Sequence, residues 1–149
     1  MSTAVDRTPL RWLALAALVG AVAIMIAPTL PYSWSGDGET IVDDWYTWFS
    51  LLPIGGGANF AVAVAVPAVL IALVGTALAA FKVRVLGNIP GRAPAIWSAI
   101  AAVAAAVATA FGGGHGVWAW VAVALMAGAA VANGLAGRRA LPETHRTPT

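Results

Sequence analysis

Four long apolar segments dominate this sequence and limit what it can fold into. They run from Trp12 to Leu30, Asn59 to Phe81, Pro94 to Phe111 and Val117 to Gly137, and none contains Asp, Glu, Lys, Arg or His. About 20 mostly apolar residues in a helix cross the roughly 30 Å hydrocarbon core of a bilayer. Each segment is therefore predicted to be a transmembrane helix.

The overall composition agrees with a membrane protein. The chain is 60% hydrophobic and 9% charged, whereas soluble domains carry about 25% charged residues. All eight Lys and Arg residues stand beside the apolar spans and form no basic helix or patch, so we expect no nucleic-acid partner. The alanine-rich composition favours a bacterial source.

The basic residues also predict the orientation. They fall in three segments, before the first span, between the second and third, and after the fourth, which share one side of the membrane. Because loops rich in Lys and Arg stay in the cytoplasm, we expect a multi-pass protein of the plasma (inner) membrane with both termini cytoplasmic. Residues 1–11 and 138–149 would be cytoplasmic tails, the second disordered, around a single transmembrane domain of residues 12–137.

Small residues at helical spacing should mark where the helices pack, because lipid-embedded helices associate through close backbone approach. In the first span such residues are Ala16, Gly20, Ala23 and Ala27, and in the second they are Ala61, Ala65, Ala68, Ala72, Gly75 and Ala79. The fourth offers a less regular series, Ala119, Ala122, Ala129, Asn133 and Ala136, interrupted by Met126. We expect Gly20, Gly75, Ala105 and Asn133 to serve as packing residues.

The third span separates bulky from small residues most clearly. One stripe holds Ile96, Trp97, Ile100, Val103, Val107 and Phe111, and the opposite side holds Ser98, Ala101, Ala102, Ala105 and Thr109. The bulky stripe should face lipid. Thr76 in the second span and Asn133 in the fourth lie at similar depths near the inner surface. A hydrogen bond between them is a further hypothesis, beside the alternative that each is satisfied locally or meets water.

The segment between the first two spans, residues 31–58, is long compared with the usual connection of about 4 to 6 residues. From Thr40 its pattern is typical of a helix, because Ile41, Trp45, Trp48 and Leu52 share one face. We therefore predict a short amphipathic helix over residues 41–52, lying in the outer interface or over the helices. Trp34, Asp43, Asp44, Trp45 and Trp48 are the candidate interaction residues of this loop.

Together these patterns predict an all-α membrane protein, a four-transmembrane-helix antiparallel bundle with a short amphipathic helix in its first outer loop. Two of its three connections are short, as in bundles of antiparallel neighbours.

No pattern of residues points to catalysis or to a cofactor. The acidic residues of the outer loop do not have the spacing of a calcium loop, and the spans hold no ionisable residue of the kind that proton-coupled transport uses. We assign no catalytic, cofactor-binding or metal residue.

The hypothesis is a non-enzymatic accessory or interaction protein whose outer loop meets the lipid bilayer, another membrane or envelope protein, or a second copy. The alternatives are a subunit of an oligomeric small transporter or channel, and a lipid-modifying enzyme that uses the outer carboxylates.

Overall fold

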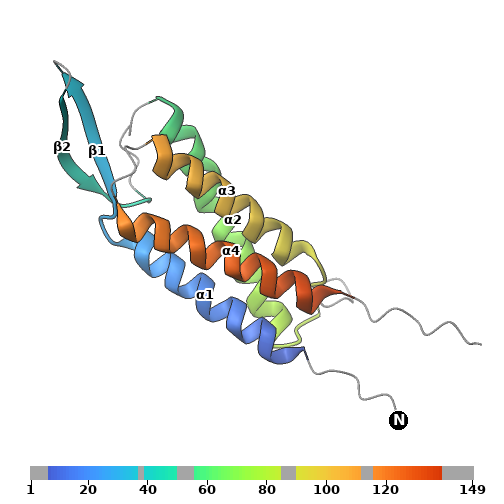
Figure 1. Ribbon diagram of the computed structural model, residues 1–149. Helices are drawn as coiled ribbons and strands as arrows, with labels where there is room; N and C mark the ends of the chain where they lie inside the picture. Colours follow the sequence, from blue (N-terminus) through green and yellow to red (C-terminus); the bar gives the residue numbers. More distant parts are fainter. Residues whose placement is uncertain (1–6, 37–38, 50–55, 85–89, 112–115, 139–149) are drawn as a thin grey trace, which may run out of the picture.

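The computed structural model describes residues 7–36, 39–49, 56–84, 90–111 and 116–138, and for 30–36, 39–46 and 56–59 it describes the backbone. Four helices pack together, and a two-stranded sheet extends from one end of them (Figure 1). They are α1 (Thr8–Ile26), α2 (Gly56–Ala80), α3 (Ala93–Phe111) and α4 (Val117–Gly137), with β1 (Leu30–Gly36) and β2 (Glu39–Tyr46) between α1 and α2. All four helices are long and apolar enough to cross a membrane. By the length and composition of its helices, the chain is a small multi-pass membrane protein.

Helix α1 begins at Thr8 rather than Trp12 and ends at Ile26 rather than Leu30. Proline is tolerated in the first turn of a helix, where Pro9 lies. At the other end Ala27 takes an extended conformation, with φ −74° and ψ 154°, because a following proline disfavours helical backbone. The shift places Arg11, which the sequence predicted to flank the membrane, inside the helix.

The amphipathic helix predicted from residue 41 onward is not present in the described part of that segment. Residues 39–46 instead form β2, which pairs antiparallel with β1 from Gly36↔Glu39 to Leu30↔Tyr46. The pairing passes from Tyr32↔Asp44 to Ser33↔Val42, so Asp43 is the extra residue of a bulge. The second part of the prediction, residues 50–52, lies outside the described residues.

Local sequence explains why strands form here. Thr40, Ile41 and Val42 are β-branched and favour extended backbone. The two residues between the strands are Asp37 and Gly38, the Asp-Gly pair typical of two-residue hairpin loops. The helical spacing of the tryptophans was therefore the weaker signal.

The end of α2 is closed by a turn that usually requires glycine. The N–H of Val83 donates to the carbonyl of Leu78 at 2.8 Å, and that of Lys82 donates to Ala79 at 3.2 Å. This pair of bonds is the Schellman motif, whose left-handed position is here held by Lys82 with φ 55°. A positive charge at a helix C-terminus suits the helix dipole.

The core consists mainly of alanine, so the helices approach closely. Helix α2 packs along α3, and α4 packs along both α1 and α3 (Figure 1). On α3 the predicted division is confirmed: the small face is buried, and the whole bulky stripe is exposed. On α2 the alanines of the predicted seam are buried as well: Ala61, Ala65, Ala68, Ala72 and Ala79.

On α1 the predicted packing face is wrong for its three alanines, whereas Gly20 is half-buried and lies close to α4. Ala16, Ala23 and Ala27 are exposed, whereas the buried residues are Arg11, Ala14, Leu18, Ala21 and Met25. These five follow the three-and-four spacing of one helix face. Since alanine occurs on every side of this helix, the spacing of small residues could not identify the buried face. In the structure the polar contacts of Arg11 identify that face.

Candidate functional site

A buried polar cluster joins three helices at the end of the bundle opposite the hairpin. The Nη1 of Arg11 donates to Oδ1 of Asn133 at 2.9 Å, and Nδ2 of Asn133 donates to Oγ1 of Thr76 at 2.8 Å. Asn133 and Thr76 are fully buried, and Arg11 is 8% exposed. The hydrogen bond predicted between Thr76 and Asn133 is thus present, and it belongs to a larger network.

Arg11 also holds the chain that leads into α3. Its Nη2 donates to the carbonyl oxygen of Gly91 at 2.8 Å and to that of Pro90 at 3.4 Å. The same carbonyl of Gly91 would lie 2.9 Å from a Cβ placed on Gly137, so a methyl group there would collide with backbone. The start of α1, the start of α3 and the end of α4 therefore meet around one carbonyl group.

At the other end of the bundle, Trp48 anchors the hairpin. Its indole Nε1 donates to Oγ1 of Thr29 at 3.1 Å, and its backbone N–H donates to the carbonyl of Met25 at 3.0 Å. Thr29 Oγ1 in turn donates to the carbonyl of Ile24 at 3.2 Å. These bonds satisfy carbonyls that the last turn of a helix leaves without helical partners. Trp48 is 1% exposed and is the largest fully buried side chain among the described residues.

The structure distributes the predicted interaction residues over the hairpin and its base. Trp34 lies in β1 opposite Ile41, and Trp45 lies in β2 opposite Pro31. Asp44 is paired with Tyr32, next to the bulge at Asp43. Trp48, in contrast, belongs to the core of the bundle, so its role is to hold the hairpin.

The four predicted packing residues all lie close to a neighbouring helix or in the buried core. A Cβ on Gly20 would meet Leu125 of α4 at 3.3 Å, and one on Gly75 would meet Pro94 of α3 at 3.3 Å. Ala105 is fully buried. Asn133 packs within the polar cluster described above.

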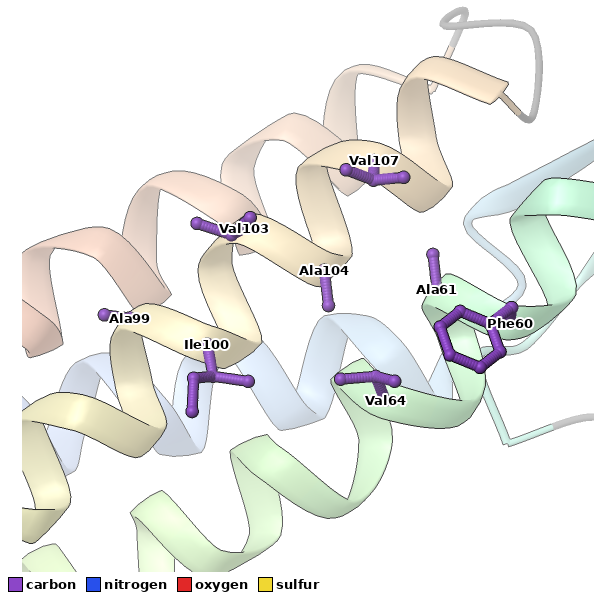
Figure 2. Close-up of a pocket in the computed structure, with 8 residues that line it drawn as sticks. All are labelled: Phe60, Ala61, Val64, Ala99, Ile100, Val103, Ala104 and Val107. Carbon is purple, nitrogen blue, oxygen red and sulfur yellow. The ribbon is translucent and has the colours of Figure 1, made fainter.

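An apolar groove of about 450 Å³ runs between α2 and α3 near the end that bears the hairpin. Figure 2 shows Phe60, Ala61 and Val64 of α2 facing Ile100 and Ala104 of α3 across it. All of its lining residues are hydrocarbon side chains. Such a surface suits a lipid chain or an apolar helix and offers no group that could bind an ion or take part in acid–base chemistry.

Two residues of these sites were missed by reasoning from the sequence. Arg11 stands directly before the apolar segment, and there it had the pattern of a topology signal. Thr29 was counted within the first span. The signal that could have identified Thr29 is Pro28, which ends α1 and leaves a polar side chain beside exposed helix carbonyls.

Comparisons with protein-family models, with curated proteins and with solved structures find no match to this chain.

Proposed function

We propose that this chain is a non-enzymatic accessory or interaction protein of a bacterial inner membrane, folded as an antiparallel four-helix bundle. In this proposal both termini are cytoplasmic and the hairpin lies on the outer side. Charge asymmetry supports the orientation. Among the described residues, every Lys and Arg lies at the end away from the hairpin, and the carboxylates Glu39, Asp43 and Asp44 all lie in β2. Basic segments resist export across the membrane.

The observation that carries the proposal is the way the hairpin is mounted. It extends beyond the helices (Figure 1), while its two ends are joined by the hydrogen bond between Thr29 and the indole of Trp48. A sheet of two strands leaves both outer edges open to further pairing. An extended segment of a partner can therefore add to either edge through main-chain hydrogen bonds.

The partner in this proposal is another membrane or envelope protein. The acidic residues of β2 favour a partner surface that carries Lys or Arg, since complementary charge steers association and suppresses wrong partners.

Photo-crosslinking in native membranes tests this function. A photoreactive amino acid at position 35, in β1, should give a discrete protein adduct, and one at position 19, exposed on α1, should give lipid adducts. Charge reversal by Asp43→Lys with Asp44→Lys should weaken the adduct at position 35. The control Arg84→Gln, at the opposite end, should leave it unchanged. If position 35 gave no adduct, or if its adduct were insensitive to the acidic pair, the hairpin would not be the interaction element.

A subunit of an oligomeric transporter or channel is the second candidate. The described core is filled by alanine and a few larger apolar side chains, and the polar groups of Arg11, Asn133 and Thr76 bond to one another. A path for a solute would therefore have to form between several copies of the chain. The groove in Figure 2 offers an apolar surface on which a helix of a neighbouring copy could pack. Solute flux in proteoliposomes, together with an oligomeric mass in detergent, would favour this candidate over the first.

A further inference from the structure

A second groove, between α3 and α4, differs from the one in Figure 2 because its mouth is charged. It has a volume of about 620 Å³ and lies at the end of the bundle away from the hairpin. Arg92, directly before α3, and Arg138, directly after α4, line its outer part, and both are exposed. Its walls are formed by residues of both helices: Ala95 and Ile96 of α3, and Val131, Gly134 and Leu135 of α4.

The lining changes from cationic to apolar along the helix axis. Val131 lies seven residues before Arg138, which at 1.5 Å per residue is about 10 Å along α4. Glycine at position 134 leaves room between the helices, since a Cβ there would meet only Ala95, at 4.0 Å. The groove therefore offers a cationic mouth and an apolar slot that begins beside it.

The tryptophans place this mouth at the lipid headgroups. Trp97 on α3 and Trp12 on α1 are exposed at the same end of the bundle, and exposed tryptophan prefers the membrane–water interface. Arg92 precedes Trp97 by five residues, about 7 Å further from the membrane centre. The guanidinium groups can thus reach headgroup phosphates, while Val131 and Leu135 lie at the level of the acyl chains.

From this arrangement we infer that the groove between α3 and α4 binds one anionic phospholipid of the cytoplasmic leaflet. Arg92 and Arg138 contact its phosphate, and one acyl chain lies along Ile96, Val131 and Leu135. Charge complementarity selects the occupant, because the described residues at this end include no carboxylate and basic pockets between transmembrane helices recognise anionic headgroups. The inference rests on the membrane orientation in the proposed function, and it is independent of the hairpin and its partner.

Native mass spectrometry of the full chain in neutral detergent tests the inference. Equal amounts of phosphatidylglycerol and phosphatidylcholine are added, and the ratio of the two bound lipids is measured. Each arginine near an anionic group contributes about a fivefold preference, so Arg92→Gln with Arg138→Gln should lower the ratio by about twenty-fivefold. The control, Lys82→Gln with Arg84→Gln, removes the same charge at the same end but outside the groove, and it should retain the preference.

Further measurements distinguish a lipid site from a phosphate site and from diffuse attraction. Inorganic phosphate should not displace the lipid, because the acyl chain contributes to binding; displacement would mean a site for free phosphate and would overturn the inference. Equal losses in the two double variants would mean diffuse attraction and would overturn it as well. Carbonate extraction of the same membranes reports integration separately. An integrated chain without lipid preference refutes the lipid site alone, whereas a chain that is extracted refutes the proposed function too.

Discussion

Arg11 links three parts of the chain that are distant in sequence. Its guanidinium donates to Asn133, to Gly91 and to Pro90, and a planar group with five N–H donors suits such divergent acceptors better than an ammonium group does. The burial of this charge is compatible with a membrane helix because the residue lies one turn inside α1, close to the bundle end.

Replacing Arg11 by leucine should destabilise the bundle by about 1–2 kcal/mol, since the buried oxygen of Asn133 would lose its donor. Unfolding of the purified protein in mixed micelles of increasing SDS fraction measures the effect. Arg84→Leu, an exposed position in the connection after α2, should change stability little. A variant at position 11 as stable as the parent chain would show that the network contributes specificity rather than stability.

The two glycines at positions 128 and 137 should respond to alanine in opposite directions. A methyl group on Gly137 would lie 2.9 Å from the carbonyl oxygen of Gly91, whereas one on Gly128 would meet nothing within 4 Å. Gly137→Ala should therefore lower stability by about 1–2 kcal/mol through overpacking. Gly128→Ala should raise it by up to about 1 kcal/mol through helix propensity. Thermal unfolding midpoints in detergent test both, and equal signs would contradict the close approach at Gly91.

At the scale of the helices, α3 offers the sharpest comparison of buried and lipid-facing positions. Ala105 is fully buried and Val103 is 66% exposed, two residues apart on the same helix. Ala105→Leu should cost about 1–3 kcal/mol because a close-packed core cannot accept three more carbon atoms without strain. Val103→Leu should be silent. The SDS unfolding titration distinguishes them, and two silent substitutions would mean that α3 faces the other way.

The helices differ in how much of their packing could be predicted from sequence. On α3 the bulky and small residues separate onto opposite sides, so the pattern alone identifies the buried face. On α1 the face depends on acceptors for Arg11 that come from α4 and from the segment before α3, and such tertiary partners leave no trace in local spacing. The contact of Thr76 with Asn133 could be predicted because two isolated polar residues at one depth have few alternatives in a bilayer.

The hairpin shows a competition between two local signals. Trp45 and Trp48 stand at helical spacing, which favoured a helix, but the sequence between the strands is Asp-Gly, a pair typical of two-residue hairpin loops, and β2 contains the β-branched residues 40–42. In the structure the two tryptophans belong to different parts of the molecule: Trp45 lies in β2, and Trp48 lies in the core of the bundle. Spacing predicts a shared face only when both residues belong to one element.

At the scale of the whole molecule, the charge asymmetry predicts topology. A reporter that fluoresces only in the cytoplasm should be active when fused after Arg139 or inserted in the connection of residues 82–92. A phosphatase that is active only after export should be active near Gly36. Positive charges hold their segments on the cytoplasmic side. Phosphatase activity from the 82–92 connection would show the opposite orientation, and the lipid groove would then lie on the outer side of the membrane.

The separation between Arg11 and Asn133 also sets an order of events during biosynthesis. Of the four helices, α4 is translated last, and it supplies the side-chain acceptor Asn133, 122 residues after Arg11. A nascent chain that carries only α1, α2 and α3 already holds the carbonyl acceptors of Gly91 and Pro90, but its guanidinium lacks the amide oxygen of Asn133. In a chain truncated after Phe111, Arg11→Leu should therefore lengthen the half-life of the protein. In the full-length protein the same substitution should shorten the half-life. Pulse-chase decay measures both, and a change in the same direction would separate the arginine from assembly. The buried charge of Arg11 should thus destabilise the chain before α4 is present and stabilise it once the four helices have assembled.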